Sequence, residues 1–418
     1  MGASMQNRTM SKGRYLAAGI GCALAAASVS IPAATASSRA ARPAATASSR
    51  AARPAARHAA AAAHAAAAST CTASIGDVGP YTGTVAALGD EQLDFAKLAI
   101  MRFNAQYHTN LTLVEEDDQF IPAQTVTKVQ ELISNPAIVA TEGPATTAGV
   151  EATGTLLKRA GLAAVSPSAT QEDIVKGSYD FPTMFTVVGS AWTEAPAVGG
   201  YLVKVLHAKR VFIVDDESSF AIVFAKTVGA YQKAHGVPIA HTEVSPSQTD
   251  FSSLISTIPA GTDYIYLAFG TASEGELFGQ QLAAAGRQIT IFGDNGLFSP
   301  TEFKINGSYV ESFAPNIRQI PADAAIVKQA DQLYGTGWGT YGGPSYAAMW
   351  VLASAVYNVC KAGQTPTRAN VLAQVYKTDE KTSILGRPIS FSRGELVNPT
   401  KWIFHLVNGK YIQVAQSG

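Results

Sequence analysis

The sequence predicts an α/β protein with two lobes, each built on a doubly wound parallel sheet. The chain has 418 residues, of which 47% are hydrophobic, and this is ample for two globular domains. From Ala73 onward, short apolar strands alternate with amphipathic helical stretches, which is the pattern of a parallel sheet covered by helices. After residues 184–189 the alternation starts again. A doubly wound sheet of this size rarely grows further as one domain, so we expect a second lobe.

The first series of elements alternates four strands with three helices. In its first helix, Leu93, Leu98 and Phe103 fall on one apolar side. The strands are apolar runs that end in turn residues. Strands are expected at 73–79, 111–117, 137–141 and 162–165, and helices at 90–105, 123–133 and 148–160.

The second series repeats this pattern after a helix at 192–206. Its strands are apolar, and Asp250 is expected to cap the helix at 251–258. Strands are expected at 210–216, 237–244, 263–270 and 288–293, and further helices at 221–235 and 274–285.

The first seventy residues differ from the rest. Basic residues precede an alanine-rich apolar run at 16–29, and small residues follow, so 1–36 is expected to be a secretory signal peptide. Cys22 stands in a poor lipobox and too early in the run, which favours a soluble exported protein over a lipoprotein. Residues 37–70 are rich in Ala and Arg and hold no core-forming side chains, so they are expected to form a disordered tether.

Charge and cysteine content narrow the possible partners. The first seventy residues contain eight Lys or Arg and no Asp or Glu, so the remainder of this neutral chain has a net charge of −8. An acidic globule is an unlikely partner for nucleic acid. Beyond the leader only Cys71 and Cys360 remain. Export permits a disulfide between them, but their separation in sequence leaves the pairing open.

The sequence favours a binding protein over an enzyme, without a metal or cofactor. It contains no G-x-S-x-G elbow, H-E-x-x-H, C-x-x-C or phosphate-binding loop. The histidines beyond the leader are scattered without metal-ligand spacing. The acidic runs 115–118 and 215–217 could hold a divalent cation, but a solvated charge run is the favoured interpretation.

Two hydroxyl-rich stretches follow predicted strands of the first series. Ser166, Ser168 and Thr170 follow one strand, and Thr146 and Thr147 follow another. One interpretation is local hydrogen bonding within turns. The other is a ligand site, because ligands of doubly wound sheets bind beyond the carboxyl ends of strands.

The chain resembles the periplasmic solute-binding proteins of ABC transporters, in the leucine/isoleucine/valine-binding branch. The resemblance rests on the number, order and spacing of individually weak motifs. It implies the type I periplasmic binding fold, with two lobes joined by three crossovers and a ligand in the cleft between them. By analogy, lobe 1 is 71–188 plus 319–397, and lobe 2 is 189–318 plus 398–418. The motifs are IGDVGPYTGTVAALGDE (75–91), EEDD (115–118), TEGPATTAG (141–149), AAVSPSATQ (163–171), RVFIVDDESSF (210–220), TDFSSLIS (249–256), SYAAMWVLASAVYNVCKAG (345–363) and ILGRPISFSRGE (384–395).

The resemblance also implies which residues hold the carboxylate of a ligand. A hydroxyl in the G-x-x-x-[ST] turn, here Thr147, is expected to bind the α-carboxylate. Main-chain and hydroxyl groups of the S-P-x-A-T turn are expected to assist, here those of Ser168, Ala169 and Thr170. Several fixed donors suit a small anion.

Departures from the family pattern bear on the other end of the ligand. Phe220 stands where a tyrosine is usual, and Thr271 stands where a second tyrosine is usual. The acidic partner of an α-ammonium group falls on Asn295, with Asp294 beside it. In addition, Leu88 replaces an aromatic residue, while Tyr341 keeps an aromatic wall. Either Asp294 substitutes for the missing acid, or the ligand is not an α-amino acid.

The expected function is an extracytoplasmic solute-binding protein of an ABC transporter. We expect it to be a periplasmic monomer that delivers a small carboxylate-bearing solute, a branched-chain or related amino acid, to an inner-membrane permease. The alternative is an extracytoplasmic sensor of a small amide or aromatic acid that acts through a receptor partner.

Overall fold

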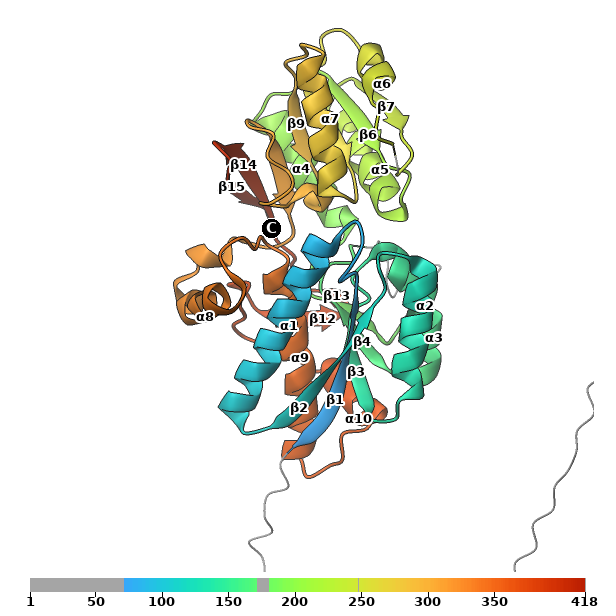
Figure 1. The fold of residues 1–418 in the computed structure, drawn as a ribbon, viewed down its shortest axis with the longest axis vertical. Helices are drawn as coiled ribbons and strands as arrows, with labels where there is room; N and C mark the ends of the chain where they lie inside the picture. The colour runs from blue at the N-terminus through green and yellow to red at the C-terminus, as the bar shows by residue number, and fades with distance from the viewer. Residues whose placement is uncertain (1–70, 171–179, 247, 418) are drawn as a thin grey trace, which may run out of the picture. The chain divides into compact units, whose positions relative to one another are not determined.

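The computed structural model describes residues 71–170, 180–246 and 248–417, all within one unit that spans 67–418. The expected signal peptide and tether lie outside these described residues. Two mostly parallel sheets are covered by helices (Figure 1), which confirms the α/β class and its two doubly wound sheets.

The first sheet has five parallel strands in the order β2-β1-β3-β4-β5. Because β2 lies on one side of β1 and the later strands lie on the other, the order reverses between β1 and β3. Loops at the carboxyl ends of strands form a crevice at such a reversal. The strands are β1 (Thr72–Gly79), β2 (Asn110–Asp117), β3 (Ile138–Glu142), β4 (Ala163–Ser166) and β5 (Met184–Thr186).

Helices cover both faces of the first sheet (Figure 1). Helix α1 packs against α9 on one face, and α2 packs against α3 on the other. A small sheet of β11 (Asp379–Glu380), β12 (Ile389–Ser392) and β13 (Glu395–Leu396) adjoins β5. The helices are α1 (Ala86–Tyr107), α2 (Pro122–Ser134), α3 (Thr147–Ala160), α8 (Ala324–Tyr334), α9 (Gly342–Lys361) and α10 (Arg368–Val375).

The second sheet has seven strands in the order β15-β14-β10-β9-β8-β6-β7. It is parallel from β7 to β10, whereas β14 and β15 form an antiparallel hairpin that the sequence interpretation did not include. The strands are β6 (Val211–Asp215), β7 (Ile239–Glu243), β8 (Tyr264–Ala268), β9 (Thr290–Gly293), β10 (Tyr309–Ser312), β14 (Lys401–Val407) and β15 (Lys410–Ser417). Its helices are α4 (Ala191–Lys204), α5 (Ser219–Ala234), α6 (Ser252–Thr257) and α7 (Ala272–Ala284).

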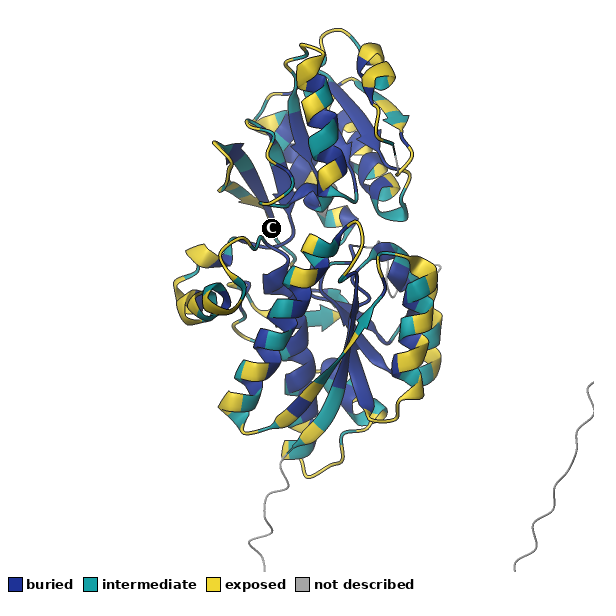
Figure 2. Cartoon of the chain, in the orientation of Figure 1, coloured by how far each residue is buried: buried dark blue, intermediate teal, exposed yellow. Residues whose placement is uncertain are grey.

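Burial of both sheet faces explains why the central strands are continuously apolar (Figure 2). In β6, Val211 and Ile213 pack into a cluster with α4 and α5, while Phe212 and Val214 point into the main core. Successive side chains of a strand alternate between faces, so each residue of β6 meets a helix layer.

Three connections carry the chain between the two sheets. They run from β5 to α4 (187–190), from β10 to α8 (313–323) and from β13 to β14 (397–400). The three crossovers expected from the resemblance are therefore present. The lobe boundaries drawn from it remain a proposal.

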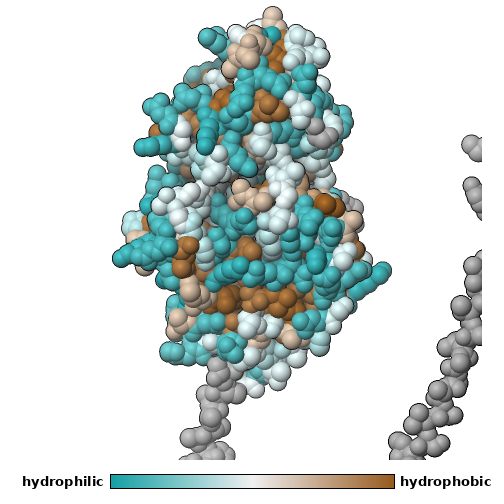
Figure 3. All heavy atoms as spheres, viewed as in Figure 1, coloured by the Kyte–Doolittle hydropathy of each residue, from teal (hydrophilic) through white to brown (hydrophobic). Residues whose placement is uncertain are grey.

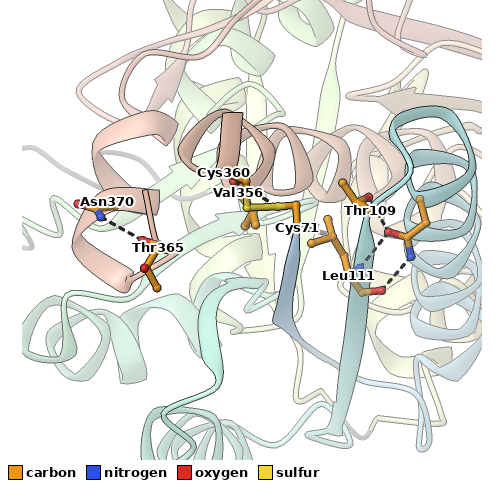
Figure 4. Close-up of a disulfide and its surroundings, with 8 residues drawn as sticks. Cys71, Thr109, Leu111, Val356, Cys360, Thr365 and Asn370 are labelled. Carbon is orange, nitrogen blue, oxygen red and sulfur yellow. Dashed lines mark hydrogen bonds between the residues drawn. A yellow bond between two sulfur atoms is a disulfide. The ribbon is translucent and has the colours of Figure 1, made fainter. Parts of the chain in front are cut away.

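A disulfide joins the start of the first sheet to the end of α9, which resolves a pairing that the sequence left open. Cys71 directly precedes β1, and Cys360 lies in the last turn of α9 (Figure 4). Their Cα atoms lie 5.7 Å apart, within the range for a disulfide. The bridge lies at the amino end of β1, opposite the carboxyl ends of the strands.

The surface of the described residues mixes polar and apolar groups. On the face shown in Figure 3, a hydrophobic patch crosses the part of the molecule that contains the first sheet. Within the described ranges, no helix has both the length and the apolar character needed to cross a membrane.

Candidate functional site

A cavity of about 90 Å³ lies between loops that follow the carboxyl ends of strands in both sheets. Loops after β3 and β4 line one side, and loops after β6, β8 and β9 line the other. This is the position expected for a ligand of doubly wound sheets. The lining residues are Val85, Leu88, Phe120, Ala145, Thr146, Thr147, Ala148, Ser168, Ser218, Ser219, Phe220, Gly270, Asn295, Gly296 and Tyr341.

The amino end of α3 faces this cavity. Thr146 caps the helix, since its Oγ1 accepts a hydrogen bond from the Gly149 N–H at 3.1 Å. Thr147, the first helical residue, lines the cavity and is 5% exposed. The capping role therefore belongs to Thr146 and does not explain Thr147. The first N–H groups of a helix have no partner within it, so this end favours an anion.

The turn before α3 is set by close backbone packing. Gly143 has a φ of +83°, and a Cβ at this position would lie 2.2 Å from the Val78 carbonyl oxygen. Only glycine fits such a place without moving the backbone. Gly143 thereby holds the turn against β1 and determines where the amino end of α3 begins.

Ser166, the last residue of β4, and Ser168 hold this turn in place. Ser166 Oγ donates to the Pro144 carbonyl, and Ser168 Oγ donates to the Ala145 carbonyl, each at 2.6 Å. Ser168 Oγ also accepts from Gln92 Nε2 at 2.8 Å. Ser168 lines the cavity, but its hydroxyl proton already serves the Ala145 carbonyl. The local interpretation of these hydroxyls thus holds for both serines.

Ala169 and Thr170 lie behind the cavity wall. The Ala169 N–H donates to Ser166 Oγ at 3.0 Å, and the residue is 1% exposed. Thr170 is also buried, and its Oγ1 has no hydrogen-bond partner among the described residues. Neither residue is among those that line the cavity. Their contact with a ligand remains a prediction.

The second sheet contributes the amino end of α5. Ser218 caps this helix, because its Oγ accepts from the Ala221 N–H at 3.2 Å. Phe220 lines the cavity and packs against Phe224, with ring centroids 4.7 Å apart. Leu88 lines the cavity from the first sheet's side. Ser218 and Ser219 were missed as site residues, although they directly precede Phe220 in its motif.

Asp294 and Thr271 do not reach the cavity. Asp294 is fully buried, and its Oδ1 accepts from the Gly296 N–H at 3.0 Å. Burial, together with the neighbouring Asp216 and Glu311 carboxylates, raises its pKa well above the usual range. Thr271 precedes α7, and its hydroxyl donates to Glu274 Oε2 at 3.2 Å. The structure therefore does not place Asp294 where it would substitute for the missing acid in the wall.

Asn295 and Tyr341 do line the cavity and are joined to each other. The Tyr341 hydroxyl donates to the Asn295 main-chain carbonyl. Asn295 Nδ2 donates to Glu311 Oε2 at 3.0 Å. Glu311 is fully buried, and burial raises its pKa to about 8. Glu311 on β10 was not singled out from the sequence, where it is one isolated acidic residue.

Lys401 connects this network to the chain segments between the sheets. Its Nζ lies 3.7 Å from Glu311 Oε1 and donates to the Gly189 carbonyl at 3.2 Å. It also lies 5.8 Å from the centre of the Phe313 ring. Gly189, Phe313 and Lys401 belong to or directly border the three different connections. Burial lowers the pKa of Lys401 well below its usual value.

One group of described residues has the composition of a metal site. Ligand atoms of Asp215, His241 and Glu243 all lie within 4.8 Å of one another, and His241 Nε2 is 2.5 Å from Asp215 Oδ2. These residues lie on β6 and the edge strand β7, and none lines the cavity. Asp215 and Asp216 are 1% and 3% exposed, so the interpretation of 215–217 as a solvated charge run was wrong for these two.

Comparisons with known proteins agree with this architecture. The Leu/Ile/Val-binding protein homolog 3 of Brucella melitensis is 25% identical over 356 residues, covering 82% of this chain and 94% of that protein. An amino acid binding protein of Pseudomonas aeruginosa is 25% identical over 335 residues, covering 77% and 87%.

Solved structures show the same fold. The leucine-binding protein LivK of Thermotoga maritima has a TM-score of 0.75 at 19% identity, covering 82% of this chain and 98% of that one. LivJ of Streptococcus pneumoniae, solved in complex with isoleucine, has a TM-score of 0.73 at 22% identity and covers 82% and 100%. The model of the family described as "Periplasmic binding protein" matches residues 72–410. The chain therefore belongs to the periplasmic binding protein family.

Proposed function

We propose that the protein is the extracytoplasmic substrate-binding component of an ABC transporter. In this proposal it captures a small carboxylate-bearing solute, a branched-chain or related amino acid, and delivers it to a membrane permease from the periplasm as a monomer. The names of the relatives support a binding protein rather than an enzyme, and they do not favour the sensor alternative. The lobes would be 71–188 plus 319–397 and 189–318 plus 398–418.

The amino end of α3 is the observation that carries the proposal. Thr147 and the first helical N–H groups face a cavity whose opposite wall comes from the second sheet. A helix amino end and a hydroxyl together stabilise a carboxylate through charge-assisted hydrogen bonds. A ligand held there contacts loops of both sheets, so binding energy favours their closed arrangement.

Asn295 supports an amino group at the other end of the solute. Its Nδ2 donates to Glu311 Oε2, and an amide oxygen has two acceptor lone pairs. An amide oxygen accepts a hydrogen bond from an ammonium group. Glu311, which accepts from this amide, is fully buried, and so is the neighbouring Asp294. In this proposal Asn295 replaces the usual acid as a neutral acceptor.

Calorimetric titration with a matched pair of variants tests the carboxylate site. L-leucine, L-isoleucine and 3,4-dihydroxybenzoate serve as probes, the last as an aromatic acid without an amino group. Thr147→Val should weaken binding by about tenfold to a hundredfold, the cost of one hydrogen bond to a charged group, and leave Tm unchanged. Thr146→Val should instead cost about 1 kcal/mol of stability through the lost cap.

The outcomes separate the alternatives. Unchanged affinity in Thr147→Val would remove the carboxylate role. Tight binding of dihydroxybenzoate without binding of either amino acid would favour the aromatic-acid ligand of the alternative.

A further inference from the structure

A second chamber of about 230 Å³ adjoins the cavity. The two share lining residues from both sheets, so a ligand held in the cavity can extend into the chamber. The chamber lies toward α8 and the loop before α9, on the side away from α3. The shared residues are Val85, Leu88, Gly270, Gly296 and Tyr341.

The charged side chains among the described residues that line the chamber are all carboxylates. They belong to Glu91, Asp94 and Glu302. Both Glu91 oxygens accept backbone hydrogen bonds at 2.6 Å, from the Gly339 and Gly342 N–H groups. Burial raises the pKa of Glu91 to about 7, and Asp94 and Glu302 are half-buried.

Aromatic rings complete the lining. Tyr334, Phe298 and Tyr341 line the chamber, and the faces of aromatic rings attract cations. Trp338 also lines it, but the Arg318 guanidinium already lies 3.6 Å from the centre of the Trp338 ring. Arg318 also forms an ion pair with Asp331 at 2.8 Å.

We propose that this chamber receives the side chain of the solute, and that this side chain ends in a cation, an amine or a guanidinium. The inference rests on the proposed function, since the α-carboxylate must be held at α3 for the side chain to point this way. Asp94 and Glu302 beside aromatic rings would leave an aliphatic side chain among polar groups that need solvent, whereas a cation satisfies them. The inference thus names a basic amino acid as the solute, in place of a branched-chain one.

L-lysine and L-norleucine form a matched pair of probes, because they differ only in the terminal ammonium group. Calorimetric titration of the full exported chain should give a Kd for lysine at least about fivefold below that for norleucine, the effect of a half-buried charge pair. Tighter or equal binding of norleucine would overturn the cationic chamber and leave the proposed function intact. Failure of both amino acids to bind while L-leucine binds would overturn the cationic chamber, and failure of all three would overturn the proposed function as well.

Variants that remove the acidic groups of the chamber test whether these groups cause the preference for lysine. Asp94→Asn combined with Glu302→Gln should abolish most of the preference for lysine over norleucine, because both substitutions remove an acidic group from the chamber lining. Asp90→Asn is the control, because Asp90 is exposed on the same helix and does not line the chamber. A lysine preference that survives the double variant, or that falls equally with Asp90→Asn, would refute the assignment to this chamber and indicate only a general effect of the acidic surface.

Discussion

Removal of the Cys71–Cys360 disulfide should destabilise the protein without changing ligand affinity. The bridge closes a loop with a sequence separation of 289 residues. The chain-entropy relation for a loop of this size gives an upper limit of about 5.7 kcal/mol, and native disulfides typically contribute about 2–5 kcal/mol. At an unfolding entropy of about 2.1 cal/mol/K per residue, this predicts a fall in Tm of about 3–7 °C for the folded chain.

The affinity for the ligand should stay unchanged when stability falls, because the disulfide lies far from the cavity. β1 has eight residues between Cys71 and the loops at its carboxyl end. At about 3.3 Å per residue, the disulfide is roughly 26 Å away from that end of the sheet.

The assay compares three samples by scanning calorimetry and by titration with a bound solute. They are the oxidised protein, the reduced protein and Cys71→Ser combined with Cys360→Ser, which leaves no unpaired thiol in the folded part. A Tm within about 1 °C of the oxidised protein would refute the loop-closure reasoning. A tenfold weaker affinity would refute the separation of the bridge from the site.

Three further predictions concern buried groups and closure. Asn295→Asp should lower stability by about 1–3 kcal/mol in denaturant titrations, because it replaces the donor to Glu311 with a second carboxyl group. Stability should fall as pH rises from about 4.5 to 7, since the native state keeps a proton on Glu91 that the unfolded state has lost. Glu91→Gln should reduce this dependence of stability on pH in thermal melts across the same range. An unchanged dependence would show that other carboxyl groups cause it. Small-angle scattering should show a smaller radius of gyration with saturating solute, and an unchanged radius would contradict closure.

The strands were the most predictable elements of the fold. β6 and β8 are apolar on both faces because helices cover both, and this signal is local. The ends of helices were less predictable: α1 was expected to begin at Asp90 but begins at Ala86, because the turn after β1 continues into it. The β14–β15 hairpin follows a change of sheet, which local periodicity does not reveal. Its Asn408-Gly409 turn, with φ values of +52° and +73°, is a recognisable hairpin signal that could have indicated it.

Six of the ten residues expected to bind a ligand line the cavity. Leu88, Thr147, Ser168, Phe220, Asn295 and Tyr341 line it, whereas Ala169, Thr170, Thr271 and Asp294 lie outside its lining. The difference is one of side-chain direction. Adjacent residues such as Asp294 and Asn295 share a loop but point to different surroundings, and only the packed structure decides which one faces the cavity. The same limit applies to the disulfide, since a long separation in sequence carries no information on distance.

The position of Lys401 has a consequence for how affinity can be tuned. Because Lys401 Nζ contacts Gly189 and Glu311 and lies near Phe313, movement of any one connection disturbs at least one of its contacts. A Cβ on Gly189 would lie 2.9 Å from Lys401 Cε and 2.8 Å from Pro399 Cβ, so this junction tolerates little added volume. A change there that shifts the balance between open and closed populations by about 1.4 kcal/mol alters apparent Kd about tenfold. Every solute would be affected by the same factor, so the strength of capture could be selected independently of the choice of solute.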